Sequence, residues 1–244
     1  MIIHKFLLQW FITNLGGSDS DSDLLYSRVT IGNLPDDVLL EVFVYVARRH
    51  LGPGERYPED EIGWRTLVHV CKRWRSVVFS SPPCLDLQLC CTNKRPVKKL
   101  LDIWPPLPIY IYAVEKSPLR GVTNILAALK QRNRVRGICI WGVPNSLLKK
   151  SVVLKRFPAL TNLNLLSHDE KAPVLPDSFL GGSAPSLRTT WLEGIPFPGI
   201  GKLLLSTTDL VSLSLFDIPH SGFISPEAMV ATLSTLTRLE GLGL

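Results

Sequence analysis

A six-residue pattern returns five times in the second half of the chain and limits the folds open to it. The pattern is apolar-x-x-apolar-x-apolar, and its copies are VRGICI at 135–140, LTNLNL at 160–165, LRTTWL at 187–192, LVSLSL at 210–215 and LEGLGL at 239–244. Thr190 is the one polar residue at an apolar position. Successive copies begin 25, 27, 23 and 29 residues apart, with a mean of 26. A unit this short cannot bury its apolar side alone, so we expect neighbouring units to stack in an array.

Each copy predicts a short β-strand, and helical spacing fills the segments between copies. These segments are PNSLLKKSVVLKRF at 144–157, FPGIGKLLLSTT at 197–208 and SPEAMVATLSTLT at 225–237. In the last segment, Ser225 is placed as an N-cap and Pro226 at the first helical position. Two earlier strand-like runs, CLDLQL at 84–89 and PIYIYAV at 108–114, flank the helical PVKKLLDIW and are expected to begin the stack. Leucine, at 41 of 244 residues, supplies most of the apolar positions.

Residues 84–244 therefore resemble a leucine-rich-repeat solenoid, an α/β fold with a parallel sheet and repeats of roughly 20–29 residues. Many such repeats carry Asn or Cys three residues after the last leucine of the pattern. Here the corresponding residues are Val143, His168, Ile195 and Ile218, so we expect an irregular convex side. The chain stops inside a strand pattern without a polar capping repeat. We expect that the array is incomplete there, or that a partner or another chain covers this edge.

The alternation of a strand predicts which side chains face the concave surface of the array. One outward column is Cys139, Asn164, Trp191, Ser214 and Gly243, and the next is Trp141, Leu166, Glu193 and Phe216. We expect a target protein to contact Trp141, Asn164, Trp191 and Phe216, because exposed aromatic side chains anchor protein interfaces. The alternative is that packing between repeats, or a covering loop, buries the aromatic rings.

The N-terminal part, residues 1–83, differs from the rest of the chain in composition and in apolar spacing. Residues 1–30 predict a flexible arm, with Gly, Ser and Asp enriched from residue 14 onward. The segment IGNLPDDVLLEVFVYVARRH at 31–50 predicts a helix, with Pro35 and two aspartates at its start and basic residues at its end. A loop is predicted at 51–62, followed by helices over Trp64–Val70 and Lys72–Phe79. Residues 31–81 thus form a predicted three-helix unit.

The motifs LPDDVLLEVF and W-x-x-L-x-x-V-C-K-R-W-R-S-V-V make residues 31–81 resemble an F-box. The departure is a longer, acidic loop at 52–62. Together with the repeats, the chain resembles the fungal-type F-box proteins with C-terminal leucine-rich repeats. F-boxes dock on the Skp-type linker of cullin-RING ubiquitin ligases. The resemblance implies that the following residues form or support the linker-binding surface: Leu34, Pro35, Val38, Leu39, Val70, Cys71 and Trp74. The alternative is that Val38, Val42 and Trp74 are only core.

The charge of the chain and the lack of catalytic motifs limit the functions that we expect for it. The net charge is +6, and the stretch 94–156 holds 14 Lys or Arg against two acidic residues. Such a surface attracts acidic partners or nucleic acid, but it is more often solvated helix surface. Motifs for nucleophilic, nucleotide-binding or metal chemistry are absent, so we expect no enzyme activity, no cofactor and no metal. Five cysteines without a C-x-x-C pair fit a reducing compartment, cytoplasmic or nuclear, and no apolar run reaches the roughly 18 residues of a membrane span.

These observations together predict a substrate-recognition adaptor of a Skp/cullin/F-box ubiquitin ligase. The helical unit would dock on the linker, and the repeats would bind the target protein. One alternative is an interaction scaffold that binds the linker without ubiquitin transfer. Another is a basic, nucleic-acid-associated platform, although no nucleic-acid motif accompanies the charge.

Overall fold

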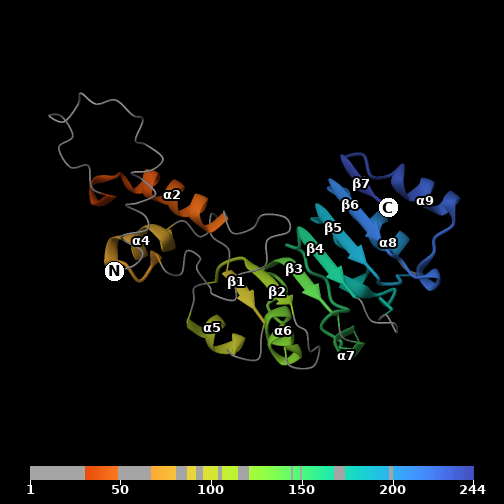
Figure 1. The fold of residues 1–244 in the computed structure, drawn as a ribbon, viewed down its shortest axis with the longest axis horizontal. Coiled ribbons are helices and arrows are strands. Elements are labelled where there is room, and N and C mark those ends of the chain that lie inside the picture. Colours follow the sequence, from red (N-terminus) through yellow and green to blue (C-terminus); the bar gives the residue numbers. More distant parts are fainter. Residues whose placement is uncertain are drawn as a thin grey trace.

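The computed structural model (Figure 1) describes residues 31–48, 67–80, 87–91, 96–103, 106–114, 121–143, 145–148, 150–167, 174–197 and 200–244. The predicted arm at 1–30 and the predicted loop at 51–62 lie outside these residues. Of the helix predicted over Trp64–Val70, only the last four residues are described: Leu67 is helical, and the three that follow form a turn. The three-helix prediction therefore concerns mainly two described helices.

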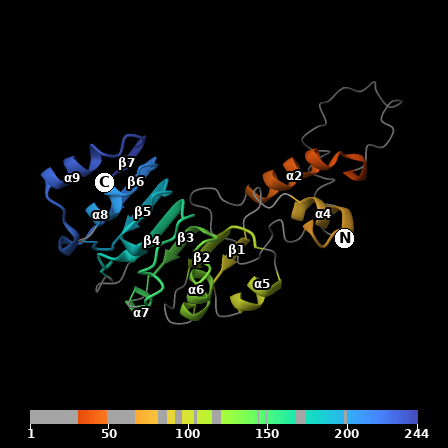
Figure 2. The same cartoon turned by 180° about the vertical axis from the view of Figure 1, so that it is seen from behind.

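A pair of helices lies beside the β1 end of the array in both views (Figures 1 and 2). After a 3₁₀ turn at Ile31–Asn33, helix α2 spans Asp36–Arg48 and helix α4 spans Lys72–Ser80. Pro35 stands directly before α2, and two aspartates occupy the first turn, where the helix dipole favours negative charge. Both helices lie where the sequence predicted them.

The contact between α2 and α4 is formed by buried side chains, of which those on α2 lie about one helical turn apart. Leu39 and Phe43 point from α2 into the contact and are buried. Trp74 does the same from α4, and its ring centroid lies 4.8 Å from that of Phe43, with the two planes tilted by 52°. This tilted geometry is favourable for aromatic pairs. The helical pair thus has an aromatic centre.

The rest of the described chain forms one seven-stranded, all-parallel sheet in which every strand pairs with its neighbours in the sequence. The strands are β1 Leu87–Cys90, β2 Ile109–Val114, β3 Val135–Trp141, β4 Asn162–Leu166, β5 Thr189–Glu193, β6 Ser212–Phe216 and β7 Gly241–Gly243. Helices alternate with them: α5 Val97–Ile103, α6 Val122–Leu129, α7 Asn145–Leu148, α8 Ile200–Leu205 and α9 Pro226–Leu233, with 3₁₀ turns at Phe179–Gly182 and His220–Gly222. The helices follow the outer side of the curved array (Figures 1 and 2). This α/β arrangement is consistent with the predicted repeats.

All five sequence patterns became strands in register. In β4 to β6 the strand begins two residues after the first leucine of the pattern, and these first leucines, Leu160, Leu187 and Leu210, are fully buried in the turn before the strand. In the first four patterns the two later apolar positions face the core, because successive side chains of a strand alternate, whereas the corresponding Leu242 and Leu244 of the last pattern are exposed. Thr190 occupies such a core position between Leu163 and Leu213, and it is 1% exposed.

Turns at the ends of the strands are held by backbone hydrogen bonds rather than by asparagine side chains. The amide of Gly142 donates to Leu166 O at 2.7 Å, and the amide of Gly194 donates to Phe216 O at 3.0 Å. Between them, the amide of Ser167 donates to the carbonyl of Glu193 at 3.0 Å. Both glycines have a positive φ. The backbone therefore supplies the hydrogen bonds that asparagine supplies in many repeats.

One helix prediction needs correction, and one helix was not predicted. Among the described residues of the segment 144–157, α7 is helical, and residues 150–155 form tight turns in which amides donate three residues back, as from Val153 to Lys150 O at 3.1 Å. Helix α6 was not among the predicted elements. The start of α9 is as predicted: Ser225 Oγ accepts from the amide of Ala228 at 3.2 Å, and Pro226 is the first helical residue.

Buried side chains of the helical pair and of the array belong to one continuous cluster, from Leu39 to Leu236. At the other end of the array, Leu242 and Leu244 are 46% and 73% exposed. Among the described helices, none combines the length and the apolar character that crossing a bilayer requires.

Candidate protein-binding surfaces

The seven residues expected at the linker surface divide into two groups. Pro35, Val38, Val70 and Cys71 are exposed, and Leu34 is half-buried. Leu39 and Trp74 are 0% and 5% exposed, so the structure assigns them to the core of the helical pair. The resemblance allowed these residues either to form the linker surface or to support it. Because Leu39 and Trp74 are buried, they can only support it. For Trp74, this is the core alternative that the sequence left open.

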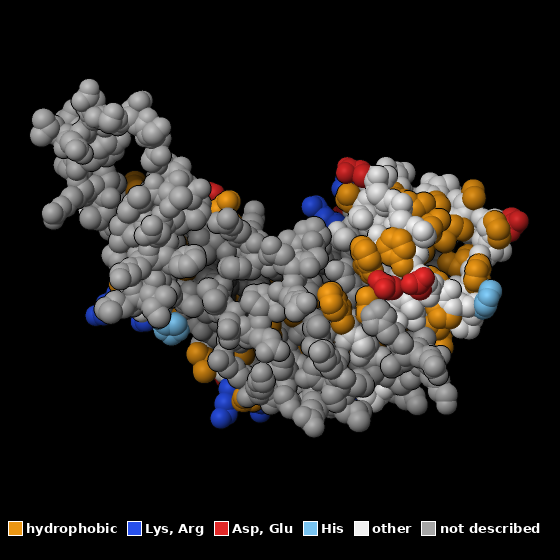
Figure 3. Space-filling view, in the orientation of Figure 1, with side chains coloured by type: hydrophobic (Ala, Val, Ile, Leu, Met, Phe, Trp, Pro, Cys, Tyr) orange, Lys and Arg blue, Asp and Glu red, His pale blue; other side chains and the backbone are white. Residues whose placement is uncertain are grey.

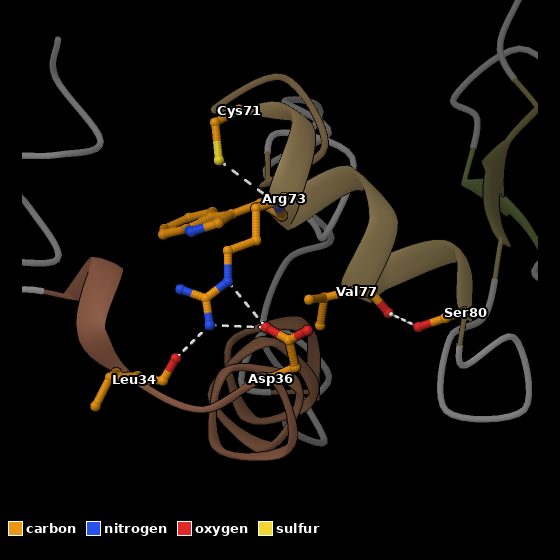
Figure 4. A network of polar contacts seen from close by, with 7 residues as sticks. Leu34, Asp36, Cys71, Arg73, Val77 and Ser80 are labelled. Atoms are coloured by element: carbon orange, nitrogen blue, oxygen red, sulfur yellow. Dashed lines mark hydrogen bonds and ion pairs between the residues drawn. The ribbon is translucent and has the colours of Figure 1, made fainter.

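Arg73 joins the starts of the two helices (Figure 4). Its Nε donates to Asp36 Oδ1 at 2.9 Å, its Nη2 lies 2.7 Å from the same oxygen, and Nη2 also donates to Leu34 O. An ion pair this exposed contributes only about 0–1 kcal/mol. Its effect is geometric, because it holds Leu34 and Pro35 next to the beginning of α4. The sequence analysis assigned no role to Arg73.

Cys71 stands at the N-terminus of α4, with its side chain exposed. The amide of Trp74 donates to Cys71 Sγ at 3.5 Å, so the thiol occupies the place of an N-cap acceptor. Figure 4 shows Cys71 and Arg73 extending from the same end of the helix. The start of α4 therefore carries Val70, Cys71 and Arg73 together.

On the array, the register confirms that the residues of both predicted columns lie opposite one another on neighbouring strands, although Cys139 is buried. Cys139, Asn164, Trp191, Ser214 and Gly243 are paired across β3 to β7, and Trp141, Leu166, Glu193 and Phe216 across β3 to β6. A third outward column precedes them: Tyr110, Gly137, Asn162, Thr189, Ser212 and Gly241. We call these three columns together the sheet face.

Aromatic side chains on the sheet face are open to solvent. Trp141 is 40% exposed and Trp191 is 42% exposed, while Phe216 and Asn164 are half-buried. The Trp191 and Phe216 rings lie 4.9 Å apart and are tilted by 49°. The alternative that packing or a loop buries these tryptophans is not seen in the described residues. In Figure 3, apolar side chains gather over the β5 to β7 end of the array, with acidic side chains among them.

Polar groups of the sheet face that the sequence analysis did not single out also contribute to it. Glu193 Oε2 accepts a hydrogen bond from Trp191 Nε1 at 3.0 Å. Tyr110 lies over Gly137, where a Cβ would come within 2.2 Å of the tyrosine ring, and its hydroxyl donates to Asn162 Oδ1 at 3.5 Å. The alternation within PIYIYAV was the available signal for Tyr110. Trp191 and Glu193 are two residues apart on one strand, and this spacing was the sequence signal that their side chains lie on the same face.

The basic residues of the stretch 94–156 that the structure describes lie outside the three columns of the sheet face. Lys98 and Lys99 are exposed on α5, and Lys130, Lys150 and Lys155 are exposed on helix ends and turns. Arg134 is half-buried instead: its Nε donates to Leu107 O at 2.9 Å, and burial lowers the pKa of its guanidinium. The described basic residues of this stretch thus include solvated lysines. They also include Arg134, which links the segments that precede β2 and β3.

No group of three or more His, Cys, Asp or Glu side chains within the described ranges is placed to hold a metal ion. Comparison with models of protein families finds no match, and comparison with curated proteins finds none either. What the chain shows is an α/β fold with one seven-stranded, all-parallel sheet in which helices alternate with strands, consistent with an arrangement like that of leucine-rich repeats.

Proposed function

We propose that this chain is a substrate-recognition adaptor of a Skp/cullin/F-box-type ubiquitin ligase. In this proposal the helical pair docks on the Skp-type linker, and the sheet face binds the target protein. The chain itself performs no bond chemistry. It raises the effective concentration of the target near the conjugating enzyme, which the partners supply.

The observation that carries the proposal is the apolar surface left on the helical pair. Although Leu39 and Trp74 share a core with the array, Val38 and Val70 remain 41% and 45% exposed. Pro35 is also exposed, three residues before Val38 in the motif that resembles an F-box. Exposed apolar side chains at the starts of two joined helices support a surface for another protein. The exposed tryptophans on the sheet face support a second protein-binding surface.

Capture of a purified Skp-type linker by the full chain tests the docking role. Replacing Leu34 and Pro35 by Ala should reduce capture at least tenfold, while the circular dichroism of the array stays unchanged. The matched control is Ile103→Ala, which removes an exposed apolar side chain, 72% exposed, from α5. The control should bind the linker as the wild type does. Unchanged capture by the double variant would refute the docking role.

A second experiment separates the adaptor from a scaffold. The complex of chain, linker, cullin and RING subunit is incubated with conjugating enzyme, ubiquitin and a protein that the sheet face binds. Cullin-dependent ubiquitylation of that protein supports the adaptor. Linker capture without ubiquitylation would instead favour the interaction scaffold. Binding to DNA with a steep salt dependence would favour the nucleic-acid platform.

A further inference from the structure

The sheet face carries a single charged residue. Its three columns contain aromatic, aliphatic, hydroxyl, amide, thiol and glycine positions, and Glu193 is the one acidic or basic residue among them. Arg136 lies at the irregularity where β3 pairs with β2, outside the columns. The chain as a whole has a net charge of +6. The carboxylate of Glu193 is therefore opposite in sign to the net charge of the chain.

Glu193 is held against an aromatic pair. Its Oε2 accepts the indole proton of Trp191 at 3.0 Å, and this bond engages one of the two carboxylate oxygens. The Trp191 ring in turn lies 4.9 Å from the ring of Phe216, which is paired directly opposite Glu193 on the next strand. The carboxylate thus lies at the indole edge of a tilted aromatic pair. We call Trp191, Glu193 and Phe216 the Trp191 patch.

A cation can interact favourably with both the aromatic rings and the carboxylate of this patch. The face of an aromatic ring attracts a cation through its quadrupole, and a carboxylate accepts charge-assisted hydrogen bonds from it. Arginine fits better than lysine, because its planar guanidinium stacks on a ring while its N–H groups point at a carboxylate in the same plane. A neutral or acidic ligand would cover Glu193 without pairing its charge, which is costly.

The neighbours of Trp191 in its column suit a peptide main chain. Asn164 and Ser214 flank Trp191 on the two adjacent strands, and both are half-buried. The Oδ1 atom of Asn164 is buried and has no hydrogen-bond partner among the described residues. An extended segment crossing the strands would place peptide groups beside these polar side chains.

From this geometry we infer that the Trp191 patch binds an arginine side chain within an extended segment of the target protein. The inference rests on the proposed function in so far as the sheet face is the target-binding surface. It adds the chemistry of the target: a basic residue in an unfolded or looped stretch, rather than an acidic or purely apolar one.

A library of random peptides displayed on phage, panned against the full chain, tests this inference. Peptides enriched on the wild type should contain arginine, and enrichment of arginine should disappear with Glu193→Gln, which keeps an acceptor for the Trp191 indole. An enriched peptide should bind at least tenfold more weakly when its arginine is replaced by citrulline, a neutral group of the same shape.

Two control variants make the outcome specific. Glu240→Gln removes an exposed carboxylate just before β7 and should leave the preference for arginine intact. Trp141→Ala removes an exposed indole two strands from Glu193 and should weaken binding without changing that preference. Enrichment of acidic or uncharged peptides, an unchanged preference in Glu193→Gln, or no enrichment at all would overturn the inference. Linker capture, measured on the same proteins, reports separately on the docking role and on folding.

Discussion

Replacing Gly194 by Ala should destabilise the array by more than its small size suggests. Gly194 follows β5 with a φ of +65°, and a Cβ built there would lie 2.0 Å from the carbonyl oxygen of Ser167. That carbonyl belongs to the adjacent turn and cannot swing aside as a side chain can. The substitution therefore forces two backbone segments apart where the turns of neighbouring strands are hydrogen-bonded.

The magnitude follows from two contributions. A left-handed backbone at a residue with a Cβ costs about 1–2 kcal/mol. Separating the turns weakens the bonds from Ser167 N to Glu193 O and from Gly194 N to Phe216 O, each 3.0 Å long and each contributing about 0.5–1.5 kcal/mol. We expect a total loss of about 2–5 kcal/mol. For a chain of this length, each kcal/mol lowers Tm by roughly 2–4 °C.

Two other glycines separate these contributions. Gly182 has a φ of +68°, but the nearest atom to its Cβ position is Asp177 O at 3.8 Å, so Gly182→Ala should show the backbone cost alone, about 1–2 kcal/mol. Gly241 has no positive φ, and its nearest neighbour is Ser212 Oγ at 3.6 Å. Gly241→Ala should therefore change stability by less than about 0.5 kcal/mol.

Differential scanning calorimetry and urea unfolding followed by circular dichroism give the three values. The order of destabilisation should be Gly194→Ala, then Gly182→Ala, then Gly241→Ala. If Gly194→Ala and Gly182→Ala were equally stable, the close contact with the Ser167 carbonyl would not be a property of the folded chain. The account of the turns would then be refuted.

Two further substitutions probe buried positions. Trp74→Ala should lower the free energy of unfolding of the helical pair by about 3–5 kcal/mol, because its ring is 5% exposed and packs on Phe43; urea unfolding followed by tryptophan fluorescence measures this, and a loss below about 1 kcal/mol would contradict its place in the core. Thr190→Val should raise stability by about 1 kcal/mol, because it replaces a buried hydroxyl that has no partner among the described residues with a methyl group of similar shape. A lower Tm for this variant would mean that the hydroxyl is satisfied in solution.

The strands and their register were predictable from the sequence because the two apolar positions nearest the end of each pattern alternate with polar ones. A shift of one residue would have turned Leu163 and Leu165 to solvent, so the pairing had one consistent solution. The same alternation placed Trp191 and Glu193 on one face. Their hydrogen bond needed only the further observation that residues two apart on a strand are neighbours.

Other features could not be read from local pattern. The spacing of apolar residues in 144–157 suits a helix, yet tight turns bury Val153 and Phe157 equally well. Helix α6 is short and begins at Gly121 without a side-chain cap, so it lacks a start signal. Whether Trp74 lies in a core or at an interface depends on Phe43, 31 positions earlier, and such long-range packing is not visible in either helix alone.

The strict pairing of each strand with its sequence neighbours has a consequence for how this protein can change. Since no strand reaches past the next one, a whole unit of about 26 residues can be duplicated or lost without rewiring the others. Under the proposed function, the width of the target-binding sheet face could then change while the helical pair that would dock on the linker stays the same.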